Sequence, residues 1–185
     1  MEDGADVFLP ECGMPVALNA TAAALLGLLH EGTMTGWDLM ARAADRIGNF
    51  WTVTQSQVYR ELARMTEHGL VTVGDPGPRD RKPYTITPVG RDAFAGWIAG
   101  EPAGDQVRVP LLLTIQFAEH LPASRLAEII ATQRTRHEER LAEYRANEKL
   151  VTDARRLATL RFGIRHEQAA LDWFDELPKL LDIPL

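Results

Sequence analysis

The sequence predicts a mainly helical protein with one small β-hairpin, in which a compact N-terminal module precedes a wholly helical C-terminal unit. Three observations predict this fold class. Apolar residues recur at helical spacing behind recognisable helix starts through most of the chain. Residues 70–87 change to a β pattern that glycine and proline interrupt. Gly100, Pro102 and Gly104 then mark a boundary between the two parts.

The first two helices are predicted from their caps and their apolar residues. The almost wholly apolar run Thr21 to Leu29 follows Asn19, a good N-cap, and Gly32 supplies a stop, which predicts a short buried helix. Thr35 is a second N-cap, and Gly48 closes the helix that it begins. The one-sided apolar stripe of this second helix consists of Trp37, Leu39, Met40, Ala43, Ala44 and Ile47.

The third helix has the clearest start. Thr54 and Gln57 have the spacing of a capping box, in which each side chain satisfies an unpaired backbone N–H at a helix start. Gly69 ends the helix, which therefore spans about Gln55 to His68. Its inward residues are Val58, Leu62 and Met65, and its opposite face carries Ser56, Arg60 and Arg64.

A hairpin and a closing helix complete this module. Leu70 to Val73 and Thr85 to Thr87 have a β pattern, and the tip between them carries the basic run Arg79 to Lys82. Thr87 followed by Pro88 predicts a helix start. The residues expected to return this helix to the core are Val89, Ala93, Phe94, Trp97 and Ile98. Three helices, a hairpin and a closing helix predict a winged helix-turn-helix domain over residues 19–100.

The C-terminal unit, residues 105–185, is predicted to be helical throughout. Leu111 to Ala118 reads as a strongly apolar helix, and Pro122 opens a long helical run to about Leu150. The inward residues of that run are Leu126, Ile129, Ile130, Gln133, His137, Leu141 and Tyr144. The last segment has the heptad spacing of a coiled-coil seam, formed by Leu157, Leu160, Ile164, Glu167, Leu171 and Phe174. We expect another helix to cover this seam, plausibly one from a second subunit, so its apolar members are the predicted dimerisation residues.

The bulk composition describes an ordinary globular chain. With 185 residues, 45% of them apolar, it can bury one respectable core or two small ones. No stretch approaches the roughly 20 uninterrupted apolar residues of a membrane span, and the acidic start Met1 to Asp6 lacks a basic signal region, so we expect a cytoplasmic protein without a membrane partner. The single cysteine, Cys12, lies in residues 1–18, which we expect to be flexible. Because the chain has only this one cysteine, an intramolecular disulfide and a tetrahedral thiolate metal site are excluded.

The third helix and the hairpin tip suit DNA recognition. A helix fits the major groove of B-DNA, and residues near the start of a recognition helix reach the base edges. The candidate residues there are Thr54, Gln55, Ser56, Gln57, Tyr59, Arg60 and Arg64. Glutamine can bond adenine with two hydrogen bonds, and tyrosine and arginine suit phosphate. On the hairpin tip, Arg81 and Lys82 can straddle the adjacent backbone or minor groove.

Charge leaves two other interpretations open. Arg60 and Arg64 can simply pair with Glu61 and Glu67 on a solvated helix face. The net charge of −6 is unfavourable for binding the phosphates of DNA, so a second alternative is a winged-helix module that binds a protein partner and no DNA. The acid surplus lies elsewhere, however, because Asn19 to Ala99 contains eight Lys plus Arg and eight Asp plus Glu. The basic residues on the hairpin tip favour DNA over both.

Several of these stretches together resemble PadR-family transcriptional regulators. They are Ala24 to Leu29, Gly32 to Leu39, Phe50-Trp51, Gln57 to Leu62, Gly69 to Val71, Asp80 to Thr87 and Gly90. The second half, with Gly163 and Trp173, resembles the virulence-activator-type helical domain of the longer subfamily. The resemblance covers about residues 20 to 177. It implies a homodimer held by the C-terminal helices, a palindromic operator in double-stranded DNA, usually repression, and often release by a small-molecule effector. It also implies that Tyr59 touches the DNA backbone, although Arg60 departs from the proline common at the next position.

Enzyme chemistry is poorly supported, and we expect no cofactor and no catalytic residue. The five histidines form no metal-ligand motif such as HExxH, and the chain has no Gly-rich phosphate loop and no Ser nucleophile elbow. If the last two long helices fold back near Val151, however, His137 and His166 lie at similar distances from the turn. They are a candidate site for a small ligand or metal, and ordinary packing is the alternative.

Overall fold

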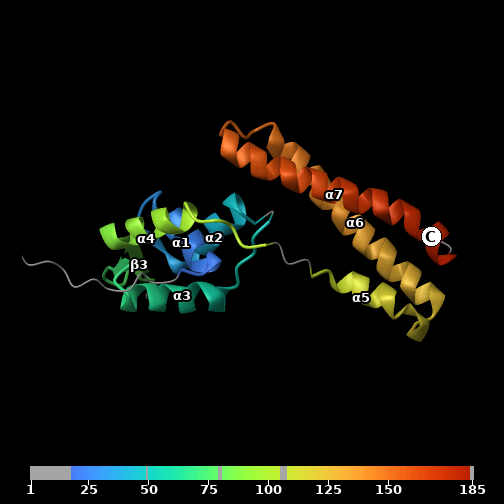
Figure 1. Ribbon diagram of the computed structural model, residues 1–185, viewed down its shortest axis with the longest axis horizontal. Helices are drawn as coiled ribbons and strands as arrows, with labels where there is room; N and C mark the ends of the chain where they lie inside the picture. The colour runs from blue at the N-terminus through green and yellow to red at the C-terminus, as the bar shows by residue number, and fades with distance from the viewer. Residues whose placement is uncertain (1–17, 49, 79–80, 105–107, 184–185) are drawn as a thin grey trace, which may run out of the picture. The chain divides into compact units, whose positions relative to one another are not determined.

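The computed structural model describes residues 18–48, 50–78, 81–104 and 108–183. The described residues divide into two compact units, one within residues 18–45 and 53–101 and the other within residues 46–52 and 102–183 (Figure 1). The predicted flexible segment 1–18, with Cys12, lies outside the described residues apart from Leu18.

The first unit is a winged helix built around α1. Its elements are α1 (Ala20–Leu29), β1 (Met34–Thr35), α2 (Gly36–Arg46), α3 (Gln55–Glu67), β2 (Val71–Val73), β3 (Pro83–Ile86) and α4 (Pro88–Ile98). α1 packs against α3, α4 and β3, and all four of its leucines are buried, as expected for a helix that is apolar all round. The side chain of Asn19 accepts the backbone N–H of Ala22 at 2.8 Å, which confirms the predicted cap.

Both ends of α3 are fixed by the signals that predicted them. At the start, Thr54 and Gln57 form the capping box. At the end, the backbone N–H of Leu70 donates to Met65 O at 2.8 Å and that of Gly69 to Thr66 O at 3.0 Å. Gly69 has a φ of +66°, the left-handed conformation that this helix ending requires. The two ends of α3 are therefore set by local sequence.

The sheet has three strands, one more than the predicted hairpin. Their order is β1-β3-β2, and both pairings are antiparallel. The register places Met34 opposite Tyr84 and Thr35 opposite Pro83. A two-residue strand shows no alternation of polar and apolar residues, so β1 has no signal in the sequence. The wing, residues 74–82, joins β2 to β3. Because β1 pairs with β3, the start of α2 lies beside the base of the wing.

The closing helix α4 covers the core with fewer residues than predicted. Its N-cap Thr87 accepts the backbone N–H of Gly90 at 3.0 Å, as expected. Val89, Trp97 and Ile98, however, are 59%, 40% and 62% exposed, so the prediction that they point inward is wrong. Phe94, which was also predicted to point inward, does contact α1, and its ring lies against Gly27.

The second unit is a helical hairpin with a short helix at its open end. Its elements are α5 (Pro110–Gln116), the 3-10 turn η2 (Ala118–His120), α6 (Ala123–Glu148) and α7 (Ala154–Leu181), and α6 packs along α7 (Figure 1). Its core cluster consists of Leu111, Leu126, Ile130, Phe174, Leu177 and Ile183.

The predicted seam of α7 is covered from within the chain. Leu160, Leu171 and Phe174 are buried in the single chain, and α6 is the long helix against which α7 packs. This corrects the expectation that a second subunit supplies the partner helix. Of the predicted dimerisation residues, only Leu157 and Ile164 remain half-buried, and a pairing role stays a proposal for them alone. The seam spacing is equally typical of an antiparallel helix pair inside one chain.

Candidate nucleic-acid interface

One face of α3 points outward, and its residues recur along the sequence at intervals of four, three and four. Ser56, Arg60, Ala63 and Glu67 lie on this face and are exposed, while Val58, Leu62 and Met65 are buried on the opposite face. Gln55 is also exposed, at the first turn. Ala63 was not among the predicted residues, because a single alanine has no distinctive signal. Glu67 places a negative charge at the far end, so the first two turns are the part suited to a polyanion.

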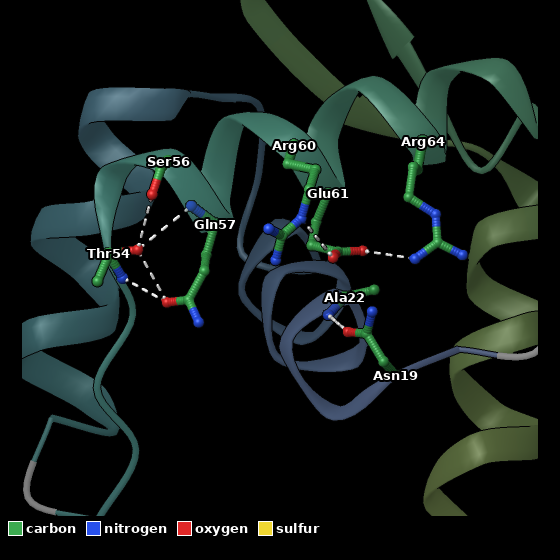
Figure 2. Close-up of polar contacts among 8 residues, drawn as sticks. All are labelled: Asn19, Ala22, Thr54, Ser56, Gln57, Arg60, Glu61 and Arg64. Atoms are coloured by element: carbon green, nitrogen blue, oxygen red, sulfur yellow. Dashed lines mark hydrogen bonds and ion pairs between the residues drawn. The ribbon is translucent and has the colours of Figure 1, made fainter.

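The capping box occupies two of the predicted base-contacting residues. The backbone N–H of Thr54 donates to Gln57 Oε1 at 2.8 Å, and the backbone N–H of Gln57 donates to Thr54 Oγ1 at 3.3 Å (Figure 2). The Ser56 hydroxyl lies 3.1 Å from Thr54 Oγ1. Thr54 and Gln57 therefore hold the start of the helix. Gln55 and Ser56 are better placed to contact bases. Gln55 takes no part in the capping box, and the Ser56 hydroxyl can exchange its contact with Thr54 for one with a base.

The two arginines of α3 share one acidic partner, as the interpretation of a paired helix face expected. Arg60 Nε lies 3.6 Å from Glu61 Oε1, and Arg64 Nη1 lies 3.5 Å from Glu61 Oε2 (Figure 2). Glu61 itself is only 3% exposed, which the sequence did not indicate. The side chains of Arg60 and Arg64 stay 64% and 50% exposed. Each guanidinium therefore keeps half or more of its side-chain surface exposed and has further N–H donors, so either arginine can bind a phosphate while it stays beside Glu61.

Tyr59 is held against the start of α2. A Cβ atom at Gly36 would lie 2.7 Å from Tyr59 Cε1, so the ring packs directly on the glycine backbone. Tyr59 remains 43% exposed. Burial raises the pKa of Tyr84 in β3, and the neighbouring Tyr59 adds to this rise. Tyr59 thus sits where α3, α2 and the sheet meet.

The wing carries the remaining basic candidates. Lys82 is exposed, and Arg81 is half-buried with its Cζ 5.3 Å from the centroid of the Trp37 ring. Arg79 and Asp80, which complete the predicted tip, lie outside the described residues. The prediction that Trp37 belongs to the apolar stripe of the second helix is wrong, because this residue is 56% exposed.

The two candidate histidines of the helical hairpin do not meet. His137 Nδ1 lies 2.5 Å from Oε2 of the buried Glu167, whose Oε1 accepts from Arg140 at 3.2 Å. His166 is exposed and stacks on Phe162 of its own helix. Because Glu167 faces inward and His166 outward, the predicted shared site of His137 and His166 is not formed. Ordinary packing describes both residues.

Among the described residues, no group of three or more His, Cys, Asp or Glu side chains is arranged to hold a metal ion. No helix among them is long and apolar enough to cross a membrane.

Comparison with known proteins assigns the family. Residues 25–96 match the model of the transcriptional regulator PadR-like family, and residues 107–182 match that of the virulence activator alpha C-terminal domain. A probable transcriptional regulator of Mycobacterium tuberculosis is 30% identical over 180 residues, an alignment that covers 85% of this chain and 95% of the relative. The chain belongs to the PadR-like family of transcriptional regulators. The negative transcriptional regulator PadR of Bacillus subtilis is 24% identical, with 86% of this chain and 96% of PadR covered.

Solved structures of two transcriptional regulators share the fold. Bacillus subtilis PadR in complex with operator DNA superposes with a TM-score of 0.72 at 21% identity, covering 88% of this chain and 99% of PadR. The virulence activator AphA of Vibrio cholerae superposes with a TM-score of 0.67 at 27% identity, covering 88% of this chain and 98% of AphA. The family and the winged-helix fold predicted from the sequence are therefore confirmed.

Proposed function

We propose that this chain is a homodimeric, sequence-specific DNA-binding regulator that inserts α3 into the major groove and sets the wing against the adjacent backbone. The observation that carries the proposal is the exposed first half of α3, with Gln55, Ser56 and Arg60, on the same unit as the basic wing residues Arg81 and Lys82. PadR of Bacillus subtilis, which has the same fold, was crystallised with operator DNA, and this supports DNA binding by the present chain. Such a protein acts on DNA in the cytoplasm and needs no catalytic step.

Repression and control by a small molecule are part of the proposal. The Bacillus subtilis relative is described as a negative regulator, and it was also crystallised with p-coumaric acid. We propose that this chain likewise represses transcription and that a small-molecule effector changes its affinity for DNA. Because an effector acts only through a difference in affinity between two states, DNA and effector must weaken each other's binding by the same factor.

Dimer formation requires a surface other than the buried part of the α7 seam. The exposed apolar residues Leu112 and Leu113 of α5, with Phe117 just after it, are 45%, 65% and 55% exposed. Apolar side chains gathered on one short helix suit pairing with a second subunit. We propose that they contribute to the dimer interface. Two identical subunits can then present two α3 helices to a palindrome with half-sites about 34 Å apart.

The test of base reading is substitution at the start of α3. We expect Gln55→Ala and Ser56→Ala each to cost about 1 to 3 kcal/mol of binding free energy on the specific operator and to leave nonspecific DNA almost unaffected. The measurement is a fluorescence anisotropy titration of DNA from the upstream region of the chain's own gene and of a scrambled duplex. Gln168→Ala, in the C-terminal hairpin, is the matched control. Equal losses on both duplexes would assign Gln55 and Ser56 to backbone contact only.

The same titration separates DNA binding from the protein-interaction alternative. A DNA-binding regulator should prefer the upstream fragment at physiological salt. A winged-helix interaction module would bind both duplexes equally and only at very low salt, because residual electrostatic attraction is then its sole contribution. Membership of a family of transcriptional regulators favours the first outcome.

A further inference from the structure

The start of α2 contacts both elements of the proposed DNA-binding surface. The ring of Tyr59 from α3 packs on Gly36, and the guanidinium of Arg81 from the wing lies over the ring of the next residue, Trp37. β1 ends at Thr35 and pairs with β3, where Thr35 lies opposite Pro83, two residues after Arg81. One turn of helix therefore lies between the recognition helix and the wing.

Trp37 is not accounted for by the core. Its side chain is 56% exposed, although neighbouring Leu39 is fully buried. An exposed tryptophan on a helix that has its own buried stripe contributes little to stability by burial. The described neighbour that gives it a role is Arg81, because a guanidinium over an indole face is a favourable cation–π pair that also limits the rotamers of the arginine.

Reciprocal hydrogen bonds hold the backbone around this contact. Asp38 Oδ2 accepts from the Thr35 hydroxyl at 2.7 Å and from the Thr35 backbone N–H at 3.0 Å, and the Asp38 backbone N–H donates to Thr35 Oγ1 at 3.2 Å. This is a capping box at the start of α2. The hydrogen bonds from Thr35 hold the pKa of the Asp38 carboxyl below its ordinary value, and the charge of Arg81 lowers it further. Asp38 therefore stays ionised beside Arg81.

We propose that Trp37 is a positioning residue for DNA binding, whose indole fixes the wing arginine Arg81 in the orientation that meets the DNA backbone while α3 lies in the groove. This inference rests on the proposed function. The flexible side chain of an arginine on a wing loses conformational entropy when it binds a phosphate. An arginine already held on an indole face has lost most of that freedom before DNA arrives, so its contact is stronger.

Trp37→Ala should therefore reproduce the loss caused by Arg81→Ala. We expect Arg81→Ala to bind the upstream DNA about fivefold to tenfold more weakly and to flatten the slope of log affinity against log salt by about 1, the contribution of one phosphate contact. Trp37→Ala should cause much of the same loss of affinity, and the double variant should lose no more than Arg81→Ala alone. Trp37→Phe should retain most of the affinity, because phenylalanine keeps an aromatic face. Trp97→Ala, a half-exposed tryptophan on α4, is the matched control and should bind like the wild type.

A second measurement, made without DNA, keeps this inference separate from the proposed function. The indole N–H resonance of Trp37 in a ¹⁵N-correlated NMR spectrum should shift in Arg81→Ala, and those of the other three tryptophans should not. Failure of the wild type to bind any DNA, with that shift present, would overturn the proposed function and leave the pairing of Trp37 and Arg81 intact. An unshifted resonance, or additive losses in the double variant, would overturn the positioning role.

Discussion

Gly90→Ala should destabilise the winged helix by about 3 kcal/mol or more, a large part of the 5 to 15 kcal/mol that stabilises a typical domain. A Cβ atom at this position would lie 2.1 Å from the backbone oxygen of Leu70 and 3.0 Å from Ile86 Cγ1. Leu70 O cannot move away freely, because it accepts the backbone N–H of Thr87 at 3.0 Å. The first turn of α4 would have to separate from the strand that it closes. Urea unfolding followed by circular dichroism measures this loss.

Gly96→Ala is the matched control for that experiment. Gly96 lies in the same helix, and nothing approaches its Cβ position within 4 Å. Alanine there should stabilise the helix by about 0.5 to 1 kcal/mol, because glycine is entropically costly inside a helix. The two variants make the same chemical change, but we expect the free energy of unfolding to fall in one and to rise in the other. Equal stabilities for the two variants would mean that α4 does not approach Leu70 as closely as the structure places it.

Leu160→Asp combined with Leu171→Asp should unfold the C-terminal hairpin. Both leucines are 8% exposed within one chain. Burying two unpaired carboxylates in an apolar seam costs several kcal/mol each, more than a two-helix unit can lose. We expect a large fall in helical circular dichroism at 222 nm, with the near-ultraviolet signal of the winged helix retained. We also expect the dimer to be lost, because the proposed pairing surface lies at α5, which packs against this hairpin through Leu111.

Leu180→Asp, at a 66% exposed leucine of the same helix, is the control and should keep the full helical signal. The opposite result is equally informative. A double variant that keeps its helices and only dissociates, as sedimentation velocity would report, would place the seam between subunits rather than between α6 and α7.

The features predicted correctly from the sequence are those fixed by neighbouring residues. The caps at Asn19, Thr54 and Thr87 and the left-handed Gly69 each act within four residues along the chain, so their spacing is sufficient evidence. The first turn of α3 was likewise predicted from residue type and position, and the DNA-binding role of Arg81 and Lys82 stays a prediction. Family resemblance added the expectation of a paired, DNA-binding regulator.

The features that sequence reasoning missed depend on contacts between distant segments. The apolar stripe that included Trp37 and the inward face that included Trp97 were inferred from periodicity, which cannot show how much of a helix its neighbours cover. The heptad seam of α7 predicted a partner helix but not its origin, because intramolecular and intermolecular helix pairs need the same spacing. The buried Glu167 was read as one polar member of the seam, and its partners His137 and Arg140 come from α6.

The most direct test of the central proposal is selection of bound duplexes from a random-sequence pool by the full-length protein at physiological salt. Two α3 helices on identical subunits should enrich a palindrome whose half-sites lie about 10 base pairs apart, centre to centre. Gln55→Ala should lose the preference at one position of each half-site. A pool that stays random after repeated selection, with binding that vanishes as salt rises to physiological strength, would contradict a sequence-specific DNA-binding function for this surface.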